Sequence, residues 1–213
     1  MDVDEALLAT KLEELDRLLP DSGDLRGMLA SFLRTASDGE LVRINPVAFA
    51  KSHGGNEAAL IDLFLHGRKV GLLRMEWQYV CPGCGDIVES FESLTSATAH
   101  FFCQVCSADR QADLSDFIEI TFSVAKEIRQ SRYHDPWSLS AEEFFFAYRF
   151  TENGVVDDGS PLREHLKRHS VLCAFLEAGE TISFAVAAHP GFLWFTNGPA
   201  LTIRDDGTDE TRS

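Results

Sequence analysis

Hydrophobic residues recur at helical spacing along the first 40 residues of the chain. In residues 4–19 they follow an i, i+4, i+7, i+11 pattern, which predicts an amphipathic helix that ends at Pro20. A second apolar stripe predicts a helix over 24–35. Each stripe is shorter than the run of heptads that a coiled coil needs. The pattern therefore predicts an N-terminal unit, 1–40, of two short helices that pack on the rest of the protein.

The next segment, 41–80, carries clear helix start and stop signals. Asn45-Pro46 is an N-cap followed by proline at the first helical position, and Gly54-Gly55 ends the helix that follows. Asn56 caps a second apolar stripe that ends at Gly71. The residues after this glycine, up to Val80, are typical of a strand. Helix, turn, helix and strand in this order predict a winged-helix-like unit.

From residue 117 the hydrophobic period changes to two, which is typical of strands. Ile118, Ile120 and Phe122 alternate with polar residues, and four aromatic residues do so in 143–151. Further strands are predicted over 170–176, 181–188, 192–196 and 200–204. Short strands at this spacing predict an antiparallel β-sandwich or barrel over 117–205, of which we expect the sandwich, with a disordered tail at 206–213.

Composition and charge narrow the class of protein. Hydrophobic residues make up 45% and charged residues 25%, as in an ordinary soluble globular protein, and no apolar run is long enough to span a bilayer. The N-terminus lacks the pattern of a secretory signal, so we expect a cytoplasmic location and no membrane partner. The net charge of −15 repels phosphate backbones and makes nucleic acid an unfavoured partner.

Four of the five cysteines form two identical pairs in the segment 81–116. Cys81-x2-Cys84 and Cys103-x2-Cys106 are separated by 18 residues, which is the spacing of a zinc ribbon. Four thiolates close a tetrahedral site and leave no position for water, so the sequence predicts a structural Zn2+ ion rather than a catalytic one. A redox dithiol pair and an iron centre remain open as alternatives. The fifth cysteine, Cys173, lies in an apolar stretch and is predicted to be buried.

Catalytic motifs are absent from the sequence. It has no phosphate-binding loop, no G-x-G-x-x-G after a strand and no G-x-S-x-G turn. His165 and His169 have the spacing of metal ligands on a helix, but no third ligand lies nearby in the sequence. His100, three residues before the second cysteine pair, is expected to lie outside the ligand set. We therefore expect no enzymatic activity.

Residues 41–205 resemble an uncharacterised bacterial domain usually found N-terminal to class III adenylate/guanylate cyclase catalytic domains. The resemblance begins with a helical segment near Asn45-Pro46 and continues through Gly71-Leu72-Leu73, Trp77 and the two cysteine pairs. It extends through an acidic strand at 117–122, an Ile-Arg at 128–129 and a Pro-Gly hairpin in the terminal β region. It implies a regulatory or sensory module. The chain has no cyclase catalytic domain, so we expect a stand-alone or excised copy that makes no cyclic nucleotide.

The sequence thus predicts an α+β protein with a winged-helix-like unit, a zinc-ribbon insert and a C-terminal antiparallel β-sandwich. The expected function is non-enzymatic regulation through a protein partner, such as a nucleotide cyclase or another signalling enzyme, or through a small-molecule ligand. The alternative is a protein that binds nucleic acid or the transcription machinery. In that case the mildly basic segment 41–80 would supply the contacts, through His66, Arg68, Lys69 and Arg74.

Overall fold

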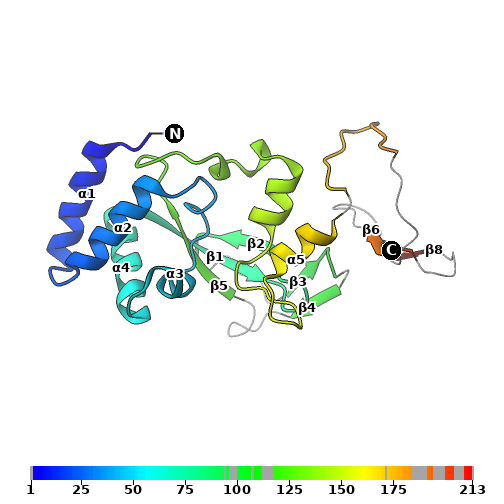
Figure 1. Cartoon of the computed structure of the whole chain (residues 1–213), viewed down its shortest axis with the longest axis horizontal. Coiled ribbons are helices and arrows are strands. Elements are labelled where there is room, and N and C mark those ends of the chain that lie inside the picture. Colours follow the sequence, from blue (N-terminus) through cyan, green and yellow to red (C-terminus); the bar gives the residue numbers. More distant parts are fainter. Residues whose placement is uncertain are drawn as a thin grey trace.

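The computed structural model has a fold that combines α-helices and β-strands. Helices α1 to α4 gather at one end, a three-stranded sheet lies in the centre, and the C-terminal strands lie at the opposite end (Figure 1). The residues that the structure describes are 2–93, 95, 100–106, 108–111, 118–170, 172–183, 191–193, 200–203 and 209–212.

The four N-terminal helices form where the sequence predicts them. They are α1 (Glu5–Leu18), α2 (Gly23–Thr35), α3 (Pro46–His53) and α4 (Glu57–Val70). Side chains cap three of them: Asp4 accepts from the amide of Leu7, Asn45 from two amides of α3, and Asn56 from the amide of Ala59. Gly71 ends α4 in the left-handed region, with φ 83°.

The central sheet is antiparallel, with the order β2-β1-β5. Its strands are β1 (Leu73–Val80), β2 (Ile87–Phe91) and β5 (Ile118–Val124), which confirms the strands predicted before the cysteines and at 118–124. One face of β5 packs on the helices, where the rings of Phe122 and Phe64 lie 5.2 Å apart. The fully buried leucines of α1, α2 and α4 complete this core.

The predicted winged-helix-like unit and zinc ribbon share this sheet. Strand β1 follows α4 and pairs both with β2, inside the predicted ribbon, and with β5. A second hairpin, β3 (His100–Cys103) and β4 (Ala108–Gln111), packs beside it. Tyr79 joins the two hairpins, because its ring stacks on Phe101 at 5.4 Å and contacts Phe91 at 4.9 Å. The helices and strand predicted for 41–80 are present, while their winged-helix class stays a prediction.

The strand predicted at 143–151 is wrong. After the short helices η2 (Arg132–His134) and η3 (Pro136–Ser138), the chain forms a π-helix, η4 (Glu143–Arg149). Ser140 and Glu143 cap its start reciprocally: each side chain accepts from the other's amide, at 3.2 and 3.1 Å. The rings of Phe144 and Tyr148 lie on one side of this helix, 5.9 Å apart. This S-x-x-E signal competes with the aromatic alternation and outweighs it.

The C-terminal part also departs from the prediction. Helix α5 (Leu162–His169) is followed by residues 172–183 without a strand, so the strand predicted at 170–176 is wrong. In this stretch Phe175 packs edge-on against Phe144, at 5.7 Å. Cys173, expected to be fully buried, is half-buried there, because no sheet covers it. Of the strand predicted at 181–188, residues 181–183 are not a strand and 184–188 lie outside the described residues.

Three short strands do form a small antiparallel sheet in the order β6-β7-β8. They are β6 (Gly191–Leu193), β7 (Ala200–Ile203) and β8 (Asp209–Arg212). Strand β6 overlaps the strand predicted at 192–196, of which 194–196 lie outside the described residues, and β7 falls within the strand predicted at 200–204. Strand β8 lies in the tail that the sequence predicts to be disordered, so that prediction is wrong there. Its pairing with β7 supplies backbone hydrogen bonds, which no apolar pattern in the sequence indicates.

No β-sandwich is confirmed in the described residues of 117–205, where β5 pairs with a strand that precedes the cysteines. No helix in the described part of the chain combines the length and apolar character that crossing a bilayer requires.

Candidate metal centre

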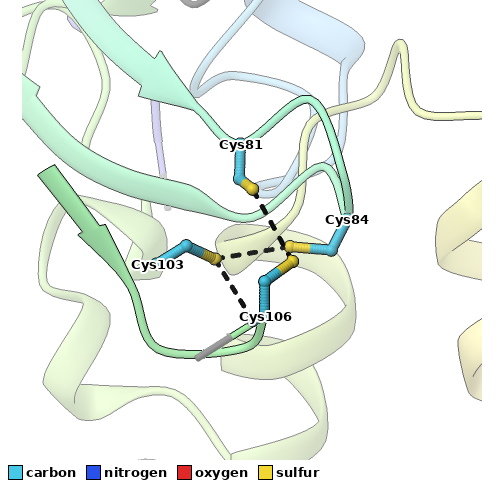
Figure 2. Close-up of side chains that lie close together, drawn as sticks. All are labelled: Cys81, Cys84, Cys103 and Cys106. Carbon is cyan, nitrogen blue, oxygen red and sulfur yellow. Dashed lines mark hydrogen bonds between the residues drawn. The ribbon is translucent and has the colours of Figure 1, made fainter. Parts of the chain in front are cut away.

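The four paired cysteines come from two hairpin turns that face each other (Figure 2). Cys81 and Cys84 lie in the turn between β1 and β2, while Cys103 ends β3 and Cys106 lies in the turn before β4. In the first turn the amide of Gly85 donates to the carbonyl of Cys81 at 2.7 Å. Gly85 has φ 69°, a conformation that favours glycine, so the turn depends on this residue.

The four Sγ atoms all lie within 4.8 Å of one another. Cys84 and Cys103 are 3.5 Å apart between sulfurs, and Cys81 and Cys106 are 3.8 Å apart. These distances are too long for disulfides, whose S–S bond is about 2.05 Å. They match the edge of about 3.8 Å that a tetrahedron of sulfurs has around zinc at about 2.3 Å. The cluster can therefore hold a metal ion.

Because the four cysteines are buried or half-buried, all four thiols can ionise only if a cation neutralises them. Cys81 and Cys103 are fully buried, and Cys84 and Cys106 are half-buried. The hydrogen bond with Cys84 lowers the pKa of Cys103 to about 5, while the same bond and burial raise the pKa of Cys84. Four thiolates at this spacing repel one another strongly unless a metal ion neutralises them.

Asp86 is the first residue around the cluster that the sequence did not indicate. Its side chain is 1% exposed and lies 3.9 Å from the sulfur of Cys103. Arg149, at the end of η4, binds both carboxylate oxygens of Asp86, at 2.5 and 3.1 Å. Burial lowers the pKa of Arg149, but the hydrogen bond with Asp86 and the negative charge of that carboxylate together outweigh it, and the net shift is upward. The signal missed in the sequence is an acid two residues after the first pair.

Arg110 is the second such residue. It lies on β4 over the turn of the first pair, and its side-chain hydrogen bonds with Cys106 and Cys81 raise its pKa. A Cβ atom on Gly83 would lie 3.1 Å from Nη2 of Arg110 and 3.4 Å from the sulfur of Cys106. Glycine at position 83 thus leaves room for the guanidinium of Arg110 beside the thiols of Cys81 and Cys106. Nothing in the spacing of the cysteines predicts this arginine.

The other residues singled out in the sequence lie away from the cluster. His100 starts β3, and the group of metal-binding side chains found in the described residues contains only the four cysteines. His165 and His169 stack on α5 with ring centroids 4.3 Å apart. His66 lies 3.2 Å from Asp62 within α4. Arg68, Lys69 and Arg74 are exposed at the end of α4 and on β1.

An open cleft of about 740 Å³ lies beside the first cysteine turn. One wall is Val80–Gly85 and the other comes from 151–165, including Thr151 and Leu162. The walls are held together by a hydrogen bond of 2.9 Å from the amide of Thr151 to the carbonyl of Gly85. The volume is in the range of small-molecule sites, roughly 300–1,000 Å³.

Comparison with curated proteins gave no match, and comparison with solved structures gave none either. A family model described as "Family of unknown function (DUF5939)" matches residues 15–197. This range includes α2 to α5, the central sheet and all four clustered cysteines. Because the match spans most of the 213 residues, the chain belongs to the family of unknown function DUF5939.

Proposed function

We propose that this protein is a non-enzymatic regulatory or sensory module built around a structural zinc ion. The observation that supports it most directly is the cluster of four sulfurs within 4.8 Å, two of them on fully buried cysteines. A tetrahedral ion with four thiolate ligands has no open position for water or substrate. Such an ion stabilises a fold and cannot activate a nucleophile.

Metal analysis of the purified protein tests the zinc part of this proposal. We expect one equivalent of zinc per chain, released when the thiols are modified, and a colourless protein. Replacement by Co2+ is expected to give the visible absorption of a tetrahedral tetrathiolate site. An iron-containing, coloured protein would make this a rubredoxin-like centre, and a protein with no bound metal would leave the cysteines as redox dithiols.

The proposed partner is a signalling enzyme, with a nucleotide cyclase as the first candidate. The resemblance of residues 41–205 to a domain that precedes class III cyclase catalytic domains supports it. The test is to capture the tagged protein from its native cells and to identify what co-purifies. Enrichment of a cyclase or another signalling enzyme supports the proposal. Turnover of a nucleotide by the purified chain alone would contradict the non-enzymatic part.

No observation favours the alternative of nucleic-acid binding. The exposed surface of α4 carries Ile61 and Leu65, which are 37% and 44% exposed, rather than a row of cations. On the same helix Asp62 lies beside His66. With a net charge of −15, binding to DNA or RNA would require a local basic patch. Gel-shift assays at low salt check this alternative. Salt-dependent binding that is lost in Arg68→Ala would support nucleic-acid binding.

A further inference from the structure

The central sheet has a second face that is polar. Directly paired residues of antiparallel strands point to the same side, and along one strand alternate residues do so. Gln78 pairs with Ser90 on β2 and with Glu119 on β5, while Glu76 pairs with Thr121. The opposite side carries Tyr79 and Phe122, which belong to the two apolar cores. We call the following set the polar face: Arg74, Glu76, Gln78, Ser90, Glu119, Thr121 and Ser123.

Three residues of this polar face, Gln78, Thr121 and Ser123, are buried. Gln78 is 0% exposed and Thr121 is 2% exposed. Arg43 covers them: its amide donates to Ser123 on β5 and its Nη2 atom donates to Ser90 on β2, each at 3.1 Å. The side chain of Arg43 therefore crosses over β1, where the polar face carries Glu76 and Gln78.

Several polar atoms in this layer have no hydrogen-bond partner among the described residues. They are Nε2 and Oε1 of Gln78, Oγ1 of Thr121 and Nε of Arg43, and each is buried. Native proteins leave few buried polar groups unpaired, so such atoms usually mark a bound water, ion or ligand. Three of these four atoms can donate a hydrogen bond. This group of unpaired atoms therefore suits a ligand that accepts hydrogen bonds.

Arg43 adds a positive charge without an ion-pair partner. No carboxylate in the described residues lies within 4.0 Å of its guanidinium, which stacks on the ring of Tyr148 at 3.6 Å. Arg43 is also the non-glycine residue with a positive φ, 53°, in the described part of the chain. Unfavourable backbone conformations persist where the surroundings impose them, and they cluster at ligand sites.

We propose that the polar face beneath Arg43 binds a small oxyanion, the carboxylate or phosphate group of a small-molecule ligand. The anion accepts hydrogen bonds from Nε of Arg43, Nε2 of Gln78 and the hydroxyl of Thr121. The proposal deepens the sensory part of the proposed function and rests on it. It does not depend on the identity of the metal.

The cleft beside the first cysteine turn gives the rest of such a ligand a place. Glu119, which pairs with Gln78, and Val80, two residues along the same face of β1, both line the cleft. The polar face thus borders, at Glu119, an open volume of about 740 Å³. A ligand in the cleft can extend its anionic group toward Arg43.

The test uses acetate and inorganic phosphate as probes on the full chain, with chloride at matched ionic strength as the reference. The readouts are the NMR signal of the Arg43 Nε–H group and the dissociation constant from calorimetry. We expect one probe to shift this signal saturably. Arg43→Met and Gln78→Leu should each weaken binding at least about tenfold, because a charged or buried donor is lost. A response to acetate alone assigns a carboxylate ligand, and a response to phosphate alone assigns a phosphate.

Controls separate a failed site from a failed fold or metal centre. Arg68→Met removes an exposed arginine at the end of α4 and should leave binding unchanged. Glu76→Gln removes the acid beside the site and should tighten binding. Metal content and circular dichroism are measured on every sample. The proposal is overturned if neither probe shifts the Arg43 signal in correctly folded, metal-loaded protein. It is also overturned if Glu76→Gln destabilises the fold without tightening binding, because Glu76 is then the partner of Arg43.

Discussion

Asp86 joins the cysteine cluster to the segment that follows the π-helix. Its carbonyl accepts from the amide of Cys81 at 2.8 Å, and its carboxylate holds Arg149. Asp86 also forms a β-bridge with Phe150. A single buried residue therefore contacts the first cysteine turn through its backbone, and the second cysteine pair and the end of η4 through its side chain. With a metal ion bound at the cluster, Asp86 would orient the cysteines in the way that outer-shell partners do at metal sites.

Asp86→Asn keeps the shape of this side chain and removes its charge. Arg149 then stays buried without a counter-charge, and the loss of one partner of a buried pair costs about 3 kcal/mol of unfolding free energy. Urea unfolding measures the change. Glu13→Gln, in the exposed pair with Arg17 on α1, is the matched control and should change little. Equal stability of Asp86→Asn and the wild type would show that the pair contributes nothing net.

His134 makes stability depend on pH. Burial lowers the pKa of His134 below its usual value of 6.5. Its Nδ1 accepts from the amide of Ser131 and its Nε2 lies 2.9 Å from the carbonyl of Val124, so the neutral ring fits both partners. Because the folded state binds this proton more weakly than the unfolded state, the contribution is complete above pH 6.5 and is lost as pH falls below it.

The measurement is the free energy of unfolding of wild type and His134→Gln at pH 7.5 and pH 5.5. The variant keeps the same cysteine cluster, so any effect of acid on metal binding is common to both proteins. We expect the wild type to lose more stability than the variant on acidification. An identical loss in the two proteins would exclude His134 as the titrating group.

At the scale of elements, η4 shows how a local signal decides between two patterns. Aromatic residues at alternate positions in 143–151 are compatible with a strand. The reciprocal cap of Ser140 and Glu143 starts a helix instead. The helix then lies beside α5, and its Phe144 packs against Phe175 of the chain that follows.

Ser140→Ala removes the serine half of this cap. Loss of an N-cap side chain costs about 1 kcal/mol, because an amide at the helix start loses its acceptor. Chemical denaturation gives the magnitude, and amide exchange in 143–149 locates it. Glu142→Gln changes a neighbouring exposed residue that caps nothing and serves as the control. A loss of stability as large in the control would assign the effect to charge rather than to capping.

At the scale of the whole molecule, the cysteine cluster links the β3–β4 hairpin to the β1–β2 hairpin, which is part of the central sheet. The first turn continues β1, which pairs with β5, and β5 packs on the N-terminal helices. The second hairpin contacts the sheet through Tyr79 and Phe101. A metal ion at the cluster would therefore stabilise more than the ribbon alone.

Removal of the metal with a chelator, or Cys106→Ser, should unfold at least the two hairpins. A structural zinc ion contributes on the order of 10 kcal/mol of folding free energy. Hydrogen exchange should show the largest loss of protection in β2, β3 and β4, with smaller changes in α1 to α4. Cys173→Ser, which lies outside the cluster, is the control. Unchanged melting of Cys106→Ser with full metal content would contradict the assignment of this ligand.

The sequence by itself determined the features whose signals are local. Caps such as Asn45 and Asn56 fix helix starts, because their side chains bond amides two or three residues away. The alternation at 118–124 fixes the strand β5, and the spacing of the two cysteine pairs indicates a four-sulfur cluster. For the caps and for β5, the deciding signal comes from residues that are close together in the chain. For the cysteine pairs, it comes from the chemistry of four thiols at the spacing of a metal site.

Only the tertiary structure decided the features that depend on distant residues. The pairing of β5 with β1, the buried pair of Asp86 and Arg149 and the position of Arg110 beside two thiols each join segments that no local pattern connects. Alternation such as that in β5 is typical of a half-buried strand, yet Thr121 and Ser123 on the polar side are buried. Arg43 covers them across some 80 residues of chain, and burial depends on such covering segments rather than on the strand itself.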